Sequence, residues 1–397
     1  MAIVFVHGVN NRAGAAYAAE VASRKRFLQR HFSGAGVDGK LLGNPVGVTS
    51  PYWGDLGVTF NWNMASLPKS KLQALGGAGG TDEAALIALV RDALPGEIGP
   101  EPLTALAKHD FRAAVDVISE LAINSAQQGS EAQVAEFIVA IAEYADANPQ
   151  PDWIAGIQND QSLLTTLEDK VKQQSGVQSL GVGAALGKLK MGAMKLKQAA
   201  QNLAGSALDK AGDFASTKLL ARSRASLNET LGRFFGDVFV YFNSRGDRSS
   251  PGQIPQRIIQ AFDDAKAATP SEPLVIVAHS LGGVISYDIL SHFRQDLHVD
   301  LFITVGSQVA HFEEMKLYHS SDRSVGPPNK VAKPQNVARW INVYDEVDIF
   351  AYGLDGVFDG FDLDLPYDTR TYVIKAHGAY WEQADFYRRL RARVDSL

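Results

Sequence analysis

The sequence predicts an α/β protein with a doubly wound, mostly parallel sheet and a large α-helical insertion. Residues 2–6 (AIVFV) form a continuous β-branched and aromatic run, which is typical of a strand buried on both faces of a parallel sheet. After Pro251, short apolar runs alternate with helical patterns, as they do in an α/β core. Between these parts, from about residue 81 to residue 231, alanine-rich segments with helical periodicity replace the strands.

The remaining core elements are predicted in the same way. Residues 15–32 are compatible with a helix, and residues 45–53 indicate a second strand, which Pro51 places near a sheet edge. In the C-terminal part we expect strands over residues 274–278, 301–305, 340–344 and 370–374, and a helix over residues 283–293. Together these strands form one sheet, and its functional loops are expected at the carboxyl ends of the strands.

The helical insertion divides the core into two parts. We predict residues 1–80 as the first part of the core, residues 81–231 as the insertion and residues 232–397 as the second part. The most regular stretch of the insertion repeats apolar residues at seven-residue spacing in two rows: Val182, Leu189, Leu196 and Leu203, and Leu186, Ala193, Ala200 and Ala207. Such a helix packs closely against a neighbour. We expect the insertion to cap the core, either as a fixed helix pair or as a mobile lid.

Composition and charge limit the classes of partner. Apolar residues make up 46% and charged residues 21% of the chain, which is typical of a globular protein. The net charge of −6 provides no chain-wide positive field, so a nucleic-acid partner is not expected. The absence of cysteine excludes disulfides, thiolate metal sites and thiol nucleophiles. Without a signal-peptide pattern or a run of about 18 apolar residues, a cytoplasmic location is expected, with signal-independent secretion as the alternative.

The strongest chemical signal is the run LVIVAHSLGGVI over residues 274–285, in which an apolar strand passes through Ser280 into a helix. Small residues lie two positions before and after the serine, at Ala278 and Gly282, because two backbones approach closely at such a turn. The run resembles the nucleophile elbow of the α/β-hydrolase superfamily, among lipase-like and esterase-like serine hydrolases. The common pattern has glycine in place of Ala278, a departure that some lipase-like members share. A serine that only caps the following helix is the alternative.

The resemblance implies that an acid and then a histidine follow the serine in the chain. His377 lies just after the last expected strand, in the run HGAYW, which is similar to the corresponding loop of lipase-like relatives. We therefore predict His377 as the general base. The other histidines beyond the elbow are weaker candidates or are expected to face solvent or neighbouring helices: His292, His298, His311 and His319.

Two aspartates compete for the role of the acid after the strand at residues 340–344. Asp345 follows the strand directly, and Asp348 follows after one short turn. The run DIFA that starts at Asp348 resembles the acid of the relatives, which an apolar residue follows. We predict Asp348 as the acid and keep Asp345 as the alternative, with a capping or positioning role in the loop if it is not the acid.

Acyl transfer also needs two donors directed at the developing oxyanion. One is the backbone N–H of Leu281, directly after the serine, and the resemblance implies that Val9 supplies the other. The pair His7 and Gly8 resembles an oxyanion loop, in which glycine lets the backbone approach the substrate. Its place near the N-terminus implies a core without the family's early antiparallel strands. We predict that elbow and loop are supported by His7, Gly8, Ala278, His279 and Gly282.

The segment between acid and base, residues 352–368, contains five aspartates among glycines. Their spacing matches no EF-hand calcium loop, so we expect a solvated polar loop and predict neither a metal nor a cofactor. The arginine run at residues 388–393 is expected at the exposed end of a terminal helix.

The resemblance implies a serine hydrolase that cleaves carboxylic esters of lipid-like or apolar acyl substrates through an acyl-enzyme intermediate. The expected partner is a small-molecule or lipid ester, and transient contact with a membrane or lipid interface fits such a substrate. Three alternatives stay open: a phospholipase or an acyltransferase with the same triad, and a binding or scaffold protein on a hydrolase fold. The sequence does not determine the oligomeric state.

Overall fold

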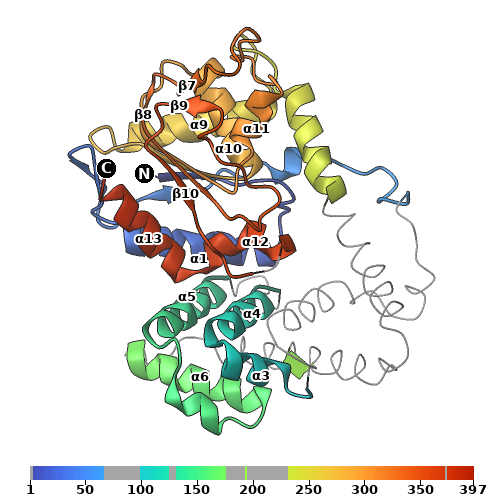
Figure 1. The fold of residues 1–397 in the computed structure, drawn as a ribbon, viewed down its shortest axis with the longest axis vertical. Helices are drawn as coiled ribbons and strands as arrows, with labels where there is room; N and C mark the ends of the chain where they lie inside the picture. The colour runs from blue at the N-terminus through green and yellow to red at the C-terminus, as the bar shows by residue number, and fades with distance from the viewer. Residues whose placement is uncertain (1–2, 67–98, 125–130, 176–192, 195–230, 372) are drawn as a thin grey trace.

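The chain folds into a six-stranded sheet with helices on both faces, an α/β fold as predicted (Figure 1). The structure is a computed structural model, and it describes residues 3–66, 99–124, 131–175, 193–194, 231–371 and 373–397. In these ranges, no helix has both the length and the apolar character that crossing a membrane requires.

The strands follow the order β10-β8-β6-β5-β1-β4 across the sheet, and every adjacent pair is parallel. Their bounds are Ile3–Val6 for β1, Val48–Thr49 for β4, Val275–His279 for β5, Val299–Val305 for β6, Val337–Tyr344 for β8 and Leu363–Pro366 for β10. Two short pairs lie outside the sheet: β2 (Gly36–Val37) with β3 (Lys40–Leu41), and β7 (Val331–Ala332) with β9 (Phe358–Asp359). Because the strands of the sheet are parallel, the loops after their carboxyl ends meet at one edge.

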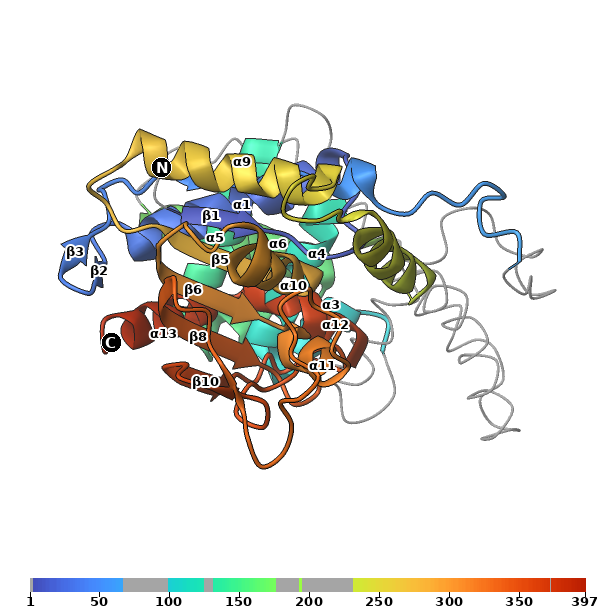
Figure 2. The ribbon, with the colours of Figure 1, turned by 90° about the horizontal axis from the view of Figure 1, so that it is seen from above.

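The two faces of the sheet build separate cores, because successive side chains of a strand point to opposite faces. In β1, Val4 and Val6 pack with α9, α10 and a helix over residues 231–244, whereas Ile3 and Phe5 pack with α1 and α13. Figure 1 shows these helix layers above and below the strands, and Figure 2 looks onto the sheet, with the strands side by side. The helices of the core are α1 (Ala15–Phe32), α9 (Gln253–Ala268), α10 (Leu281–Asp288), α11 (Val309–Glu314), α12 (Val373–Ala379) and α13 (Ala384–Val394), with the short turns η1 (Gly54–Leu56), η5 (Ile289–Phe293) and η6 (Tyr380–Glu382).

The described part of the insertion is helical, as predicted. It contains α3 (Pro102–His109), α4 (Phe111–Asn124), α5 (Glu131–Ala147), η3 (Asp152–Gly156) and α6 (Asp160–Ser175). These helices share a core of their own and lie against α1 and α13, as a second layer below the sheet in Figure 1. Ala193 of the predicted seven-residue pattern is buried in that core. The other residues of the pattern lie outside the described residues: Val182, Leu186, Leu189, Leu196, Ala200, Leu203 and Ala207.

Most predicted core elements are present, with some shifts at their ends. The helix at residues 15–32 has the predicted bounds, and β5, β6 and β8 contain or overlap the predicted strands. The strand expected at residues 45–53 is reduced to two paired residues at the sheet edge, where the chain after Thr49 contains Pro51, which has no N–H for a ladder.

The prediction of a strand at residues 370–374 was wrong. Arg370 has a φ of 55°, which ends extended structure, and α12 begins at Val373. The last strand of the sheet is instead β10, inside the segment that we expected to be a solvated polar loop. That expectation fails because Asp362 accepts the backbone N–H of Trp340, and Asp364 accepts the backbone N–H of Leu354. The sequence alone does not distinguish an aspartate that accepts a backbone N–H from an aspartate in a solvent-exposed loop.

Candidate active site

Ser280 lies at the turn between β5 and α10, at the carboxyl edge of the sheet. Its backbone has φ 54° and ψ −131°, a conformation that L-residues with a side chain rarely adopt. Strained backbone of this kind persists only where the surroundings enforce it, and it is concentrated at functional sites. Here the surroundings include the N–H of Ser280, which donates to Val305 O at 3.0 Å, and the hydroxyl of Ser307, which donates to Ser280 O at 2.8 Å.

The turn is so tight that the neighbouring positions admit only small residues, as predicted. A Cβ added to Gly282 would lie 2.3 Å from the carbonyl oxygen of Val6. A Cβ added to Gly8 would lie 2.5 Å from Cβ of Ser280. Ala278 is fully buried between the adjacent strands. The loop after β1 and the turn after β5 are therefore in direct backbone contact.

Ser280, His377 and Asp348 form a continuous hydrogen-bonded chain. Nε2 of His377 lies 2.8 Å from Oγ of Ser280, and Nδ1 lies 2.9 and 3.0 Å from the two carboxylate oxygens of Asp348. The carboxylate accepts hydrogen bonds only, so Nδ1 carries the proton and Nε2 can accept the serine hydroxyl. Ser280 and Asp348 are buried, and the side chain of His377 is 15% exposed. This arrangement can activate a hydroxyl for nucleophilic attack.

The structure brings Asp348 rather than Asp345 to the imidazole. One carboxylate oxygen of Asp345 accepts the N–H of Val347 at 3.0 Å. The other accepts the N–H and the hydroxyl of Thr369 at 2.8 and 2.5 Å. Asp345 thus has the positioning role that we considered for it, since it ties the loop after β8 to the chain after β10.

The four other histidines beyond the elbow have different contacts in the structure. The ring of His311 is stacked on Tyr352, and His319 donates to the carbonyl of Gly246. His292 lies beside His319, and His298 is exposed near Asp300. In the described ranges, no group of three histidine, aspartate or glutamate side chains is arranged to hold a metal ion.

His279, directly before the serine, fixes the segment that carries His377. Its Nε2–H donates to the carbonyl oxygen of His377 at 2.6 Å, and the two rings are 4.8 Å apart. Burial and the neighbouring His377 ring lower the pKa of His279 well below its ordinary value, so it remains a neutral donor. The elbow and the base are therefore joined by two hydrogen bonds.

The loop after β1, which we predicted to be an oxyanion loop, is anchored through His7. Its Nδ1–H donates to Gly8 O at 2.8 Å, and its Nε2 accepts the backbone N–H of Trp53 at 3.1 Å. The indole N–H of Trp53 donates in turn to His7 O at 2.9 Å, and the two rings are stacked at 5.0 Å. Only a neutral imidazole can make this pair of bonds. Burial accordingly lowers the pKa of His7 to about 4.

A buried carboxylate, Asp237, holds the far side of the same loop. It accepts the backbone N–H groups of Asn10 and Val58 at 2.9 and 2.7 Å, and the guanidinium of Arg12 at 2.8 Å. Asp237, Trp53 and Ser307 were not predicted from the sequence, because their contacts join residues far apart in the chain and leave no local pattern.

Val9 and Leu281, the predicted oxyanion donors, follow directly on Gly8 and Ser280, the two residues whose backbones meet. No described residue accepts a hydrogen bond from the N–H of Val9 or of Leu281. Asn11 donates from its side chain to the carbonyls of Gly8 and Val9, both at 3.0 Å. Those contacts orient the peptide groups of the loop and leave both predicted donors available to a ligand.

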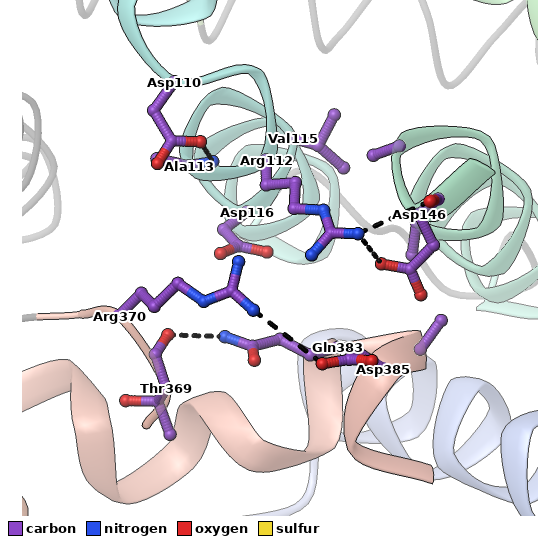
Figure 3. Close-up of a pocket in the computed structure, with 13 residues that line it drawn as sticks. Asp110, Arg112, Ala113, Val115, Asp116, Asp146, Thr369, Arg370, Gln383 and Asp385 are labelled. Atoms are coloured by element: carbon purple, nitrogen blue, oxygen red, sulfur yellow. Dashed lines mark hydrogen bonds and ion pairs between the residues drawn. The ribbon is translucent and has the colours of Figure 1, made fainter. Parts of the chain in front are cut away.

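The support of the acid loop reaches the helical insertion. Thr369, which binds Asp345, lines a cavity of about 40 Å³ between α4, α5 and the start of α13 (Figure 3). Charged side chains from both sides meet there: Arg112 pairs with Asp146 at 3.3 Å, and Arg370 approaches Asp385 at 3.8 Å. The interface between insertion and core is thus polar at this point.

Comparison of the chain with protein-family models, with curated proteins and with solved structures found no match. A function for it is therefore inferred from the geometry of the site.

We predict that His7 makes the fold sensitive to acid. Its folded-state pKa of about 4 lies below the ordinary 6.5, so the unfolded chain binds the proton more readily. The free energy of unfolding should fall between pH 6.5 and pH 4, by on the order of 3 kcal/mol from this group. Chemical denaturation at a series of pH values tests this, with His7→Gln expected to give a shallower pH dependence. His109→Gln, at an exposed histidine, serves as the control, and parallel curves for wild type and His7→Gln would contradict the prediction.

Proposed function

We propose that the protein is a serine hydrolase of the α/β-hydrolase type, which cleaves carboxylic esters. The observation that carries this proposal is the hydrogen-bonded chain from Ser280 through His377 to Asp348, with the serine at a turn of positive φ. A serine that only capped α10 would not need an imidazole nitrogen 2.8 Å from its hydroxyl oxygen. The parallel sheet and the order of the three residues along the chain agree with this fold type.

The proposed reaction proceeds in two halves. Oγ of Ser280 attacks the ester carbonyl while His377 accepts the hydroxyl proton on Nε2, and Asp348 stabilises the resulting imidazolium. The amides of Val9 and Leu281 stabilise the oxyanion of the tetrahedral intermediate. The imidazolium then protonates the leaving alcohol. In the second half, His377 deprotonates a water molecule, which attacks the acyl-enzyme, and the acid is released with Oγ reprotonated.

Apolar side chains beside His377 favour an apolar acyl group. The ring of Phe350 lies edge-on to His377 at 5.1 Å and is stacked on Phe234 at 4.4 Å. Phe235, whose ring lies 5.4 Å from that of Phe234, and Phe239 on the same helix over residues 231–244 are 50% and 63% exposed. Exposed apolar rings on a helix that contacts Phe350 through Phe234 favour a binding surface. Phospholipids are within this substrate class.

The role of the insertion as a cap is part of the same proposal. In the described ranges its helices contact the core through α1, α13 and the support of the acid loop at Thr369 and Arg370. A cap that contacts the core at Thr369 would be linked to the loop of Asp348 through the hydrogen bonds between Thr369 and Asp345. Acyl transfer to an acceptor other than water would use the same three residues.

We predict that a fluorophosphonate probe labels the folded protein at Ser280. The probe reacts with serines that a neighbouring base activates, so labelling should disappear in Ser280→Ala and be strongly reduced in His377→Ala. Ser286→Ala, at a buried serine six residues further along the chain in α10, is the matched control and should label like wild type. Folded wild type that fails to label would favour the binding or scaffold alternative.

We further predict that Asp348→Asn lowers the turnover of an ester far more than Asp345→Asn. An asparagine at 348 cannot stabilise the imidazolium and presents an amide to Nδ1, whereas an asparagine at 345 still has an oxygen that can accept from Thr369. We expect a loss of about a thousandfold or more for the first variant and less than about tenfold for the second. Steady-state hydrolysis of a chromogenic ester measures both, and the reverse ranking would overturn the choice of Asp348.

The preference for apolar acyl groups gives a third prediction. Each buried methylene contributes about 0.8 kcal/mol, so kcat/KM should rise about fourfold per added carbon until the chain outgrows the apolar surface. A series of chromogenic esters from acetate to decanoate tests this. Phe239→Ser should flatten the rise for long chains and leave acetate hydrolysis unchanged. A maximum at acetate in the wild type would exclude an apolar acyl site.

A further inference from the structure

Tyr380 joins the two parts of the site that carry the acid and the base. It lies in η6, three residues after His377, and its side chain is fully buried. Its hydroxyl oxygen is 3.0 Å from Oδ2 of Asp348 and 2.8 Å from the backbone nitrogen of Asp345. Gly306, at the end of β6, leaves room for this pair, since a Cβ there would lie 3.1 Å from Oδ2 of Asp348 and 3.2 Å from the Tyr380 ring.

The direction of both hydrogen bonds follows from the chemistry of the partners. A backbone N–H can only donate, so the hydroxyl oxygen of Tyr380 accepts from Asp345. Its own proton is then free to point to Asp348, whose carboxylate can only accept. Burial and the neighbouring Asp348 raise the pKa of Tyr380 above its ordinary value, so the hydroxyl keeps this proton at neutral pH.

Among the described residues, no lysine or arginine is paired with Asp348, and its one titratable base partner is the imidazole of His377. The negative charge of Asp348 is stabilised by hydrogen bonds from three neutral donors. The N–H of Phe350 donates to Oδ1 at 3.0 Å, Tyr380 donates to Oδ2, and Nδ1 of His377 bridges both oxygens. A buried carboxylate depends on such donors for both its charge and its orientation. Tyr380 is the side-chain donor among them that cannot take part in the proton transfer.

We propose that Tyr380 is a positioning residue for the acid of the triad: its hydroxyl clamps the loop at residues 345–350 to the segment that carries His377, and so holds the carboxylate in line with Nδ1. This inference rests on the proposed function for its consequence in catalysis. The clamp itself rests on the hydrogen bonds to Asp348 and Asp345. Without this hydroxyl, the hydrogen bond between Nδ1 of His377 and Asp348 would be the main contact between the loop at residues 345–350 and the segment that carries His377.

Tyr380→Phe removes the hydroxyl and keeps the buried ring. We expect kcat for ester hydrolysis to fall about tenfold to hundredfold, as for the loss of a hydrogen bond to a charged group, with KM unchanged. The acid limb of the pH profile of kcat/KM should move to higher pH. A carboxylate with one hydrogen-bond donor fewer stabilises the imidazolium of His377 more strongly and so raises the pH at which it loses its proton.

Tyr367→Phe is the matched control. Tyr367 is also buried and lies 6.3 Å from the Tyr380 ring, but its hydroxyl donates to Gln383. This variant should keep the wild-type kcat and pH profile. Equal losses in both variants, or a Tyr380→Phe variant that loses activity without a shift of the acid limb, would reduce Tyr380 to a structural role and overturn the proposal.

A second variant covers the case in which Tyr380→Phe does not fold. Incorporation of 3-fluorotyrosine at position 380 keeps the ring and makes the hydroxyl a stronger donor. The acid limb should then move to lower pH, opposite to its movement in Tyr380→Phe. An acid limb that stays at the wild-type position in the fluorotyrosine protein would contradict a hydrogen bond from Tyr380 to Asp348.

Proton NMR separates this proposal from the proposed function. The Nδ1–H of His377 should give a strongly downfield resonance, which Tyr380→Phe shifts and Tyr367→Phe leaves in place. If wild type neither hydrolyses esters nor labels with fluorophosphonate, the proposed function fails, and the resonance still tests the clamp. If wild type is active and Tyr380→Phe matches it in kcat, pH profile and resonance, the clamp is wrong and the proposed function stands.

Discussion

The structure of the site depends on one backbone constraint, the turn of positive φ at Ser280. It is possible only because the loop after β1 lies in backbone contact with it, with Gly8 against Cβ of Ser280 and Gly282 against the carbonyl of Val6. The contact places the backbone at Gly8 directly beside the side chain of Ser280. Small residues in two segments, more than 270 positions apart, thus serve a single turn.

Around this turn, buried polar groups are paired in a way that fixes protonation states as well as positions. The imidazole of His7 accepts a backbone N–H and is therefore neutral, and His279 is a neutral donor to the carbonyl of His377. Asp237 and Asp345 accept backbone N–H groups from the loops that flank the site. In the protein interior, a polar group that is hydrogen-bonded to fixed protein partners has little freedom to reorient. These hydrogen bonds therefore make the site rigid.

The parallel sheet explains why the site is assembled from so many separate loops. Segments after β1, β5, β6, β8 and β10 all emerge at the same edge, and each adds one contact to the network. The helical insertion joins this network at Thr369, beside the ion pairs in Figure 3. Because Thr369 binds Asp345, the packing of the insertion on the core and the position of the acid loop are structurally linked.

Local pattern in the sequence determined the α/β class, the helix at residues 15–32 and the turn at Ser280, because periodicity and turn chemistry act between near neighbours. His377 was predicted from the resemblance of its loop to that of lipase-like relatives. The resemblance favoured Asp348 and kept Asp345 as the alternative. The sequence misplaced the last strand and assigned no role to Tyr380 or Asp237. Those features were decided by tertiary contacts alone. A carboxylate that accepts a backbone N–H from 227 residues away has the same appearance in sequence as one in solvent, and only folding determines which donors come within reach.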